Sequence, residues 1–131
     1  MKLGTTTLPN ATMSGFNQAT KQVVHQIDWS DEVQITDMGL GPLSFTVTGT
    51  ATTEQERLDV IAACNEARSE ATMLFFPSTN GGDDDRYYSV KTSAANCDPY
   101  DKSAELWTYL FNCVTTPYPY LYDATTGSRL T

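Results

Sequence analysis

Residues 52–71 read TTEQERLDVIAACNEARSEA and contain the clearest secondary-structure signal in the chain. Thr53 and Glu56 have the spacing of a capping box, in which the threonine hydroxyl accepts a hydrogen bond from the third helical amide and the glutamate reaches back to the cap. Glu54 and Glu56 also place negative charge at the positive end of the helix dipole. The stretch therefore predicts a helix within residues 53–70.

Two apolar stripes run along this expected helix on nearly opposite sides. The first consists of Leu58, Ile61 and Ala62, and the second consists of Val60, Ala63, Cys64 and Ala67. A surface helix needs only one such stripe to face its core. The helix is therefore either enclosed within its own domain or in contact with a partner, and the second stripe is the candidate subunit interface.

Three strand signals surround the helix. Residues 44–51, SFTVTGTA, alternate Phe45, Val47 and Gly49 with threonines, which is the period of a half-buried strand. The strand-like runs at 72–77 and 86–95 flank a Gly-Gly turn and predict a hairpin. Residues 105–114, ELWTYLFNCV, are apolar on both faces, so they predict a central strand with neighbours over both faces.

The first 42 residues give weaker signals. We expect a short strand at 1–8, a loop at 11–20, and strands at 21–29 and 32–36. MGLGPL, at 38–43, combines two glycines with a proline and is expected to interrupt regular secondary structure.

Together these signals predict one α+β domain of 131 residues. The expected architecture is an antiparallel β-sandwich or barrel-like sheet with one flanking helix. It divides into N-terminal strands and loops (1–42), a core that contains the helix (43–123) and a polar C-terminal tail (124–131).

The charge distribution argues against tight binding of nucleic acid. The formal net charge is −8 with only eight Lys and Arg residues, and these are scattered along the chain. Affinity for DNA or RNA depends on clustered cations that displace counterions from phosphate. An acidic protein is instead suited to let DNA pass without holding it.

The sequence carries no recognisable pattern for membrane insertion or for catalysis. No run approaches the roughly 20 apolar residues of a membrane span, and MKLGTTTLPN at the start lacks the apolar stretch of a secretory signal. His25 has no nucleophile or metal-ligand pattern beside it, and Cys64, Cys97 and Cys113 form no CxxC motif. We expect reduced thiols, with Cys64 and Cys113 packed as small hydrophobes, and no enzymatic activity, metal site or cofactor.

The turn STNGGDDDR, at residues 78–86, joins the two strands of the expected hairpin. Its three adjacent aspartates, Asp83, Asp84 and Asp85, repel one another unless they are solvated or paired. The tip of the hairpin is therefore expected to project from the sandwich. The turn lacks the glycine and terminal glutamate spacing of an EF-hand loop, which favours a solvated tip over a calcium site.

The segment NCVTTPYPYLYD, at residues 112–123, ends a strand in a run of prolines and tyrosines. Proline cannot donate to a sheet, yet Tyr118, Tyr120 and Tyr122 are too apolar for a fully exposed loop. We expect an extended strap that closes the sheet edge or contacts a neighbouring subunit. Trp107 together with these tyrosines is the alternative, a platform that stacks against a sugar.

The order of these elements resembles the ring-forming proteins of long bacteriophage tails. The relevant motifs are SFTVTGTA, the capped helix, TMLFFP, the hairpin, and ELWTYLFNCV followed by TTPYPYLYD. The resemblance covers residues 43–123 and is greatest to the N-terminal domain of distal tail proteins, with a looser similarity to minor tail proteins.

The resemblance implies a phage tail-tube-like fold and a structural role in the virion. Family members assemble as rings, usually of six copies, around the DNA channel at the tail tip. The implied partners are further copies of the chain, the tail tube and the tail-tip hub proteins, with DNA passing through unbound and no membrane contact. Such a protein is made in the host cytoplasm and ends in the virion tail.

Several alternatives remain open at this point. Tail tube and tail terminator proteins share the fold, a monomeric ligand- or carbohydrate-binding module would use the aromatic platform, and a small enzyme ranks last. In a ring, Asp83–Asp85 would either line the channel or, as we favour, contact basic residues of the next ring along the axis.

Overall fold

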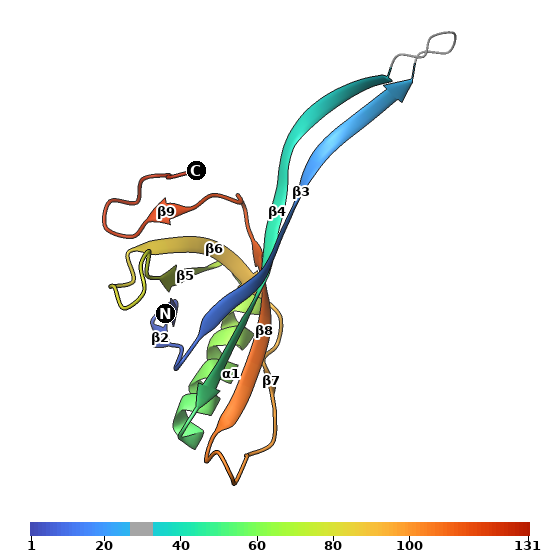
Figure 1. Cartoon of the computed structure of the whole chain (residues 1–131). Helices are drawn as coiled ribbons and strands as arrows, with labels where there is room; N and C mark the ends of the chain where they lie inside the picture. The colour runs from blue at the N-terminus through green and yellow to red at the C-terminus, as the bar shows by residue number, and fades with distance from the viewer. Residues whose placement is uncertain (27–32) are drawn as a thin grey trace.

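The chain folds around one helix and a large antiparallel sheet (Figure 1). The computed structural model describes the backbone of residues 1–26 and 33–131 and the side chains outside 19–39. Its strands are β1 (Lys2–Leu3), β2 (Thr6–Thr7), β3 (Thr12–Gln26), β4 (Val33–Ala51), β5 (Thr72–Phe76), β6 (Arg86–Thr92), β7 (Asn96–Cys97), β8 (Trp107–Thr115) and β9 (Tyr122–Asp123), and its helix is α1 (Glu54–Ser69).

The sheet has two ends and does not close into a barrel. Its strand order is β2-β1-β5-β6-β8-β4-β3, with β7 paired to β8 and β9 paired to β6. Each of these pairs is antiparallel. The α+β class and the predicted hairpin of β5 with β6 are therefore confirmed.

The helix begins where the capping residues predict. Thr53 is the N-cap, and its hydroxyl oxygen accepts a hydrogen bond of 3.2 Å from the Glu56 amide. The Glu56 carboxylate accepts in return from the Thr52 amide, at 3.2 Å. These bonds satisfy amides that a helix start leaves without intrahelical partners, so local sequence fixes where α1 starts.

One face of α1 packs on the sheet and forms the core. The buried helix residues are Val60, Ala63, Cys64 and Ala67, and the sheet contributes Phe45, Val47, Leu74, Val90, Tyr109, Phe111 and Cys113. The buried Thr92 hydroxyl donates to the Cys64 carbonyl at 3.0 Å, which ties β6 to the helix backbone. Small helix residues at this contact let the helix approach the sheet closely.

The N-terminal half is more regular than the sequence predicts. The loop expected at 11–20 and the break expected at 38–43 are both wrong, because residues 12–20 lie within β3 and residues 38–43 lie within β4. The pairing of β3 with β4 shifts register between Ser14 and Asn17 and again between Gln18 and Thr20. Gly15, at φ 68°, and the Gly41–Pro42 pair therefore lie in β-bulges, and neither strand ends there.

The strands β3 and β4 continue beyond the body of the protein as a two-stranded ribbon (Figure 1). The pairing of β4 with β8 ends at Ser44, where the Thr115 hydroxyl oxygen accepts from the Leu43 amide at 2.8 Å. From Leu43 back to Val33, β4 pairs with β3 alone among the described strands. The strands expected at 21–29 and 32–36 form part of this ribbon, although residues 27–32 and the His25 side chain lie outside the described parts.

The strand β8 is central, but only one of its faces is covered. It pairs with β4 along one edge and with β6 and β7 along the other. Tyr109, Phe111 and Cys113 are buried, whereas Thr108 and Asn112 are exposed and Val114 is 43% exposed. The expectation of neighbours over both faces is therefore wrong, because α1, the one helix among the described residues, covers the side that carries the aromatic residues.

Gly49 is required by the position of Tyr109. The Tyr109 hydroxyl donates to the Pro9 carbonyl at 2.6 Å, across the glycine. A Cβ at residue 49 would overlap the Tyr109 ring and lie 2.8 Å from the Pro9 oxygen. We predict that Gly49→Ala lowers the free energy of unfolding by about 1–3 kcal/mol, the usual cost of overpacking. Chemical denaturation monitored by circular dichroism measures this change, and unaltered stability would contradict the close contact.

Candidate functional site

The turn between β5 and β6 holds one of its three aspartates firmly. The Asp85 carboxylate accepts hydrogen bonds of 2.8 Å from both the amide and the hydroxyl of Ser78, and it lies 3.2 Å from the Arg86 guanidinium. The Ser78 hydroxyl and amide, with the nearby Arg86 charge, lower the pKa of Asp85. Arg86 also contacts Asp123 at 3.5 Å, which connects the turn to β9. Asp85 is therefore part of the turn's own structure.

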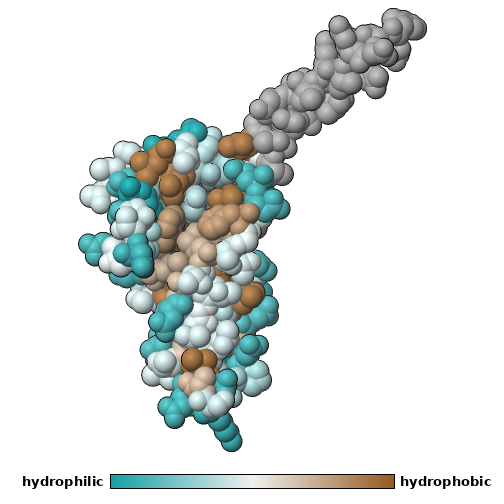
Figure 2. Space-filling model, in the orientation of Figure 1, coloured by the Kyte–Doolittle hydropathy of each residue, from teal (hydrophilic) through white to brown (hydrophobic). Residues whose placement is uncertain are grey.

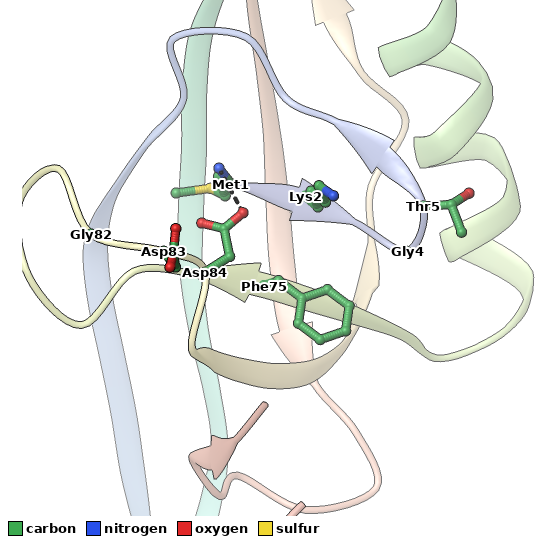
Figure 3. Close-up of a pocket in the computed structure, with 8 residues that line it drawn as sticks. All are labelled: Met1, Lys2, Gly4, Thr5, Phe75, Gly82, Asp83 and Asp84. Carbon is green, nitrogen blue, oxygen red and sulfur yellow. Dashed lines mark ion pairs between the residues drawn. The ribbon is translucent and has the colours of Figure 1, made fainter. Parts of the chain in front are cut away.

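The other two aspartates line a hollow beside the N-terminal hairpin (Figure 3). Asp84 forms an ion pair of 3.3 Å with the Met1 amino group, and the exposed Asp83 has no ion pair or side-chain hydrogen bond in the described part of the chain. The hollow has a volume of about 760 Å³ and is lined by Met1, Lys2, Gly4, Thr5, Phe75, Gly82, Asp83 and Asp84. Of the three aspartates, Asp83 is the one left free for the contact with another protein predicted from the sequence.

The described residues offer no arrangement suited to metal binding. Among residues 1–18 and 40–131, whose side chains the structure describes, no three His, Cys, Asp or Glu residues come together closely enough to hold a metal ion. The three cysteines are unpaired thiols, and burial raises the pKa of Cys64 to about 12. Cys64 and Cys113 have no exposed surface, which confirms that they pack as small hydrophobes.

The four helix residues proposed as a subunit interface lie in the core of their own chain. Val60, Cys64 and Ala67 are fully buried and Ala63 is 7% exposed, all against the sheet. The prediction that they contact a second copy is therefore wrong. The outward stripe contains Leu58, which is 45% exposed, so the two-striped pattern reflects one core face and one solvent face.

The proline-tyrosine segment closes the edge of β6 and then turns outward. The Thr116 amide donates to the Ser89 carbonyl at 2.9 Å, residues 117–121 then leave the sheet, and Tyr122 returns to pair with Tyr87. Tyr118 stacks on Tyr120 with ring centroids 5.5 Å apart, and Tyr118 remains 55% exposed. The segment is the predicted strap, and of its three tyrosines Tyr118 is the one most available to a partner.

The C-terminal residues expected to form a plain polar tail fold back on this strap. The Leu130 amide donates to the Leu121 carbonyl at 2.8 Å, and the Asp123 amide donates to the Ser128 carbonyl at 2.9 Å. The Arg129 guanidinium lies 3.4 Å from the centre of the Tyr120 ring, in a cation–π contact. The tail therefore stabilises the strap.

The aromatic residues do not form the sugar platform considered above. Trp107 begins β8 and the tyrosines follow its end, about 26 Å away at the rise of an extended strand. Tyr122 instead stacks on Tyr87 at 5.1 Å, and Tyr87 contacts Phe75 at 5.6 Å. Because these rings stack on one another, little of their faces is left for a sugar.

The β3–β4 ribbon is the most prominent feature available for contact with another molecule. Along its length the outer edges of both strands lack a paired strand among the described residues. At its base Phe16 is 50% exposed and Leu40 is 54% exposed, and Figure 2 shows apolar surface where the ribbon leaves the body. The sequence predicts strands at 21–29 and 32–36 but carries no signal that β3 and β4 extend beyond the core.

Comparisons with known proteins add no family assignment. No protein-family model and no curated protein matches this sequence. Within the described residues, no helix is both long enough and apolar enough to cross a membrane.

We predict that Ala67→Glu unfolds the isolated chain, because it places an unpaired carboxylate in the core between α1 and the sheet. Ala62→Glu, on the exposed face of the same helix, is the matched control and should leave the fold intact. Circular dichroism and thermal melting compare the two. If Ala67→Glu stays folded and loses only self-association, the core assignment of this stripe is contradicted.

We also predict a pH-dependent effect of Asp85→Asn. The pKa of Asp85 is lower in the folded state, so its ionised form stabilises the fold above about pH 4 and that contribution is lost as the pH falls through the lowered pKa. The difference in melting temperature between wild type and Asp85→Asn should therefore shrink from pH 6 to pH 3. Asp83→Asn, in the same turn, should have little effect at either pH. A difference that stays constant with pH would argue against the Ser78 contacts.

Proposed function

We propose that this protein is a structural subunit of the tail of a tailed bacteriophage. Six copies form a ring near the tail tip. The ring encloses the DNA channel and joins the tail tube to the tip. The observation that carries this proposal is the ribbon of β3 and β4, which extends from the body with no further strand paired to it among the described residues (Figure 1).

An isolated two-stranded ribbon is marginally stable in water. Its open edges expose unpaired amides and carbonyls, which natural proteins usually cover or block. The ribbon of this protein includes Val33 to Leu43 of β4, which has β3 as its only partner among the described strands. Contact with another subunit supplies both the missing burial and the missing hydrogen bonds.

A ribbon that reaches from one end of the molecule meets a different surface on its neighbour. Such a head-to-tail contact produces a closed ring when the rotation between subunits closes, and a filament when it does not. The exposed Phe16 and Leu40 at the ribbon base, and Tyr118 on the strap, are the apolar side chains placed to take part.

The arrangement of the elements also supports the proposal. The β6–β8 pairing divides the sheet into two parts. One part contains β3, β4 and β8, and the other contains β1, β5, β6 and β9. The helix α1 packs on both parts. We interpret this as the sandwich with a flanking helix that the resemblance over residues 43–123 implies. The eight Lys and Arg residues are dispersed along the chain, which suits a conduit that does not hold DNA.

A tail tube or tail terminator protein is the alternative within the same class. Purified tube subunits are expected to stack into long tubes, whereas a distal tail ring should stop at one or two rings. A monomeric binding module is less favoured because the aromatic rings stack on one another, and no group of side chains in the described structure suggests catalysis.

The test of this proposal is to replace residues 20–39 with an Asn-Gly turn. The core residues that the structure describes all lie outside this segment, so the variant should fold, with a melting temperature within about 5 °C of the isolated wild-type subunit. It should remain a monomer in native mass spectrometry, under conditions in which the wild type gives a mass of six subunits.

A matched pair of point substitutions controls for general effects of surface change. Leu40→Ser, at the ribbon base, should weaken assembly, whereas Leu58→Ser, on the exposed face of α1, should not. A wild type that is monomeric at all concentrations, or a ribbon-less variant that still assembles, would contradict the proposed function.

A further inference from the structure

The body portions of β3, β4 and β8 contain no charged residue. Residues 12–18, 40–51 and 107–115 include no Asp, Glu, Lys or Arg, although 18% of the whole chain is charged. Exposed sheet faces of soluble proteins usually carry charges of both signs. The absence of charge from three adjacent strands sets this surface apart from the rest of the molecule.

Strand alternation directs this face away from the helix. Phe45 and Val47 of β4 are buried in the core, so Thr46, Thr48 and Thr50 point to the opposite side. In the register, Thr46 lies opposite Asn112, and Thr50 lies opposite Thr108 of β8. Both of these β8 residues are exposed. The result is an uncharged face made largely of hydroxyl and amide groups.

Several of these polar groups are hydrogen-bonded to one another across the strands. Thr46 donates to the Asn112 side chain at 2.9 Å, and the hydroxyls of Thr12 and Thr48 are 3.2 Å apart. The Asn10 amide group donates to the Thr50 hydroxyl at 3.1 Å. The side chains are thus partly satisfied within the face, which lowers their tendency to seek outside partners.

Most charges of the chain lie elsewhere, although the exposed Lys91 of β6, which pairs with Val114 of β8, borders this face. The exposed side of α1 carries Glu54, Asp59 and Glu66, and the β5–β6 turn carries the three aspartates. The helix and the uncharged face lie on opposite sides of β4 and β8, because the helix packs on the side that contains Phe45 and Phe111. The negative net charge is therefore not evenly spread around the subunit.

We propose that the uncharged face of β3, β4 and β8 lines the channel of the ring, so that DNA passes along neutral hydroxyl groups. This inference rests on the proposed function. Cations on a channel wall would bind phosphate, and dense anions would repel the entering duplex. A neutral face with internally paired hydroxyls does neither. The acidic surface then faces outward.

The same face is poorly suited to be the contact between subunits. Interface cores are enriched in Tyr, Trp, Phe, Met and Arg. The exposed side chains of this face are instead mainly threonine, serine and asparagine, with Leu110 and Val114 as its apolar members on β8. The three most exposed of the large apolar side chains that the structure describes are Phe16 and Leu40 at the ribbon base and Tyr118 on the strap, and we assign the subunit contacts to these two regions.

The test introduces positive charge on this face. In Thr108→Lys/Asn112→Lys, two exposed β8 residues become lysine; the control, Ala62→Lys/Asn65→Lys, changes two exposed residues of α1. Preformed rings of each variant are mixed with a linear DNA duplex and with a closed circular duplex of the same length. A closed ring can thread only a DNA molecule that has a free end.

The β8 variant is expected to assemble into rings and to bind the linear duplex but not the circle. This affinity should fall by about 10³-fold between 50 and 200 mM salt, as phosphate contacts require. Bulky protein blocks on both ends of the linear duplex should abolish binding. Rings of the α1 variant, with their lysines outside, should not distinguish linear from circular DNA.

Three results would overturn the inference while the proposed function stands. They are loss of ring assembly in the β8 variant alone, equal binding of linear and circular DNA by that variant, and no DNA binding at all by its rings. The first would make this face a subunit contact instead. A wild type that never forms a ring would overturn the proposed function itself.

Discussion

The pairing of β4 with β8 holds the molecule together and sets the limits of its core. From Ser44 to Ala51, β4 lies against β8, and the two strands contribute Phe45, Val47, Tyr109 and Phe111 to the surface on which α1 packs. At Leu43 the pairing gives way to one hydrogen bond from the backbone amide to the Thr115 hydroxyl. The strand β8 ends at Thr115, where its other edge is paired with β6, and β4 continues with β3 alone among the described strands. The same junction therefore ends the core and begins the ribbon.

Sequence patterns predicted the elements whose stability is local. The capping residues Thr53 and Glu56 located the helix, the Gly-Gly turn located the β5–β6 hairpin, and the alternation of Phe45 and Val47 located the buried side of β4. Each of these signals depends on neighbours in the chain, which is why it can be read without the fold.

The errors arose where distant residues decide the outcome. Gly41 and Pro42 suggested a break, but β3 supplies a partner strand, and a bulge absorbs the proline. Val60 and Ala67 suggested an interface because the sequence cannot show which stripe the sheet covers, and the sheet covers that one. The Pro-Tyr strap was correctly predicted, but its stacking and the return of residues 124–131 depend on contacts with β6 and Arg129.

The proposed assembly assigns a separate role to each surface. We propose that the ribbon, its apolar base and the strap provide contacts between subunits, that the uncharged sheet face provides a passage for DNA, and that the charged helix face lies outside. The most direct measurement is electron microscopy of the purified full-length protein at several concentrations. The account predicts closed rings of six subunits with a central hole wide enough for a DNA duplex. Particles that are single subunits, compact dimers without a hole, or open filaments would contradict it.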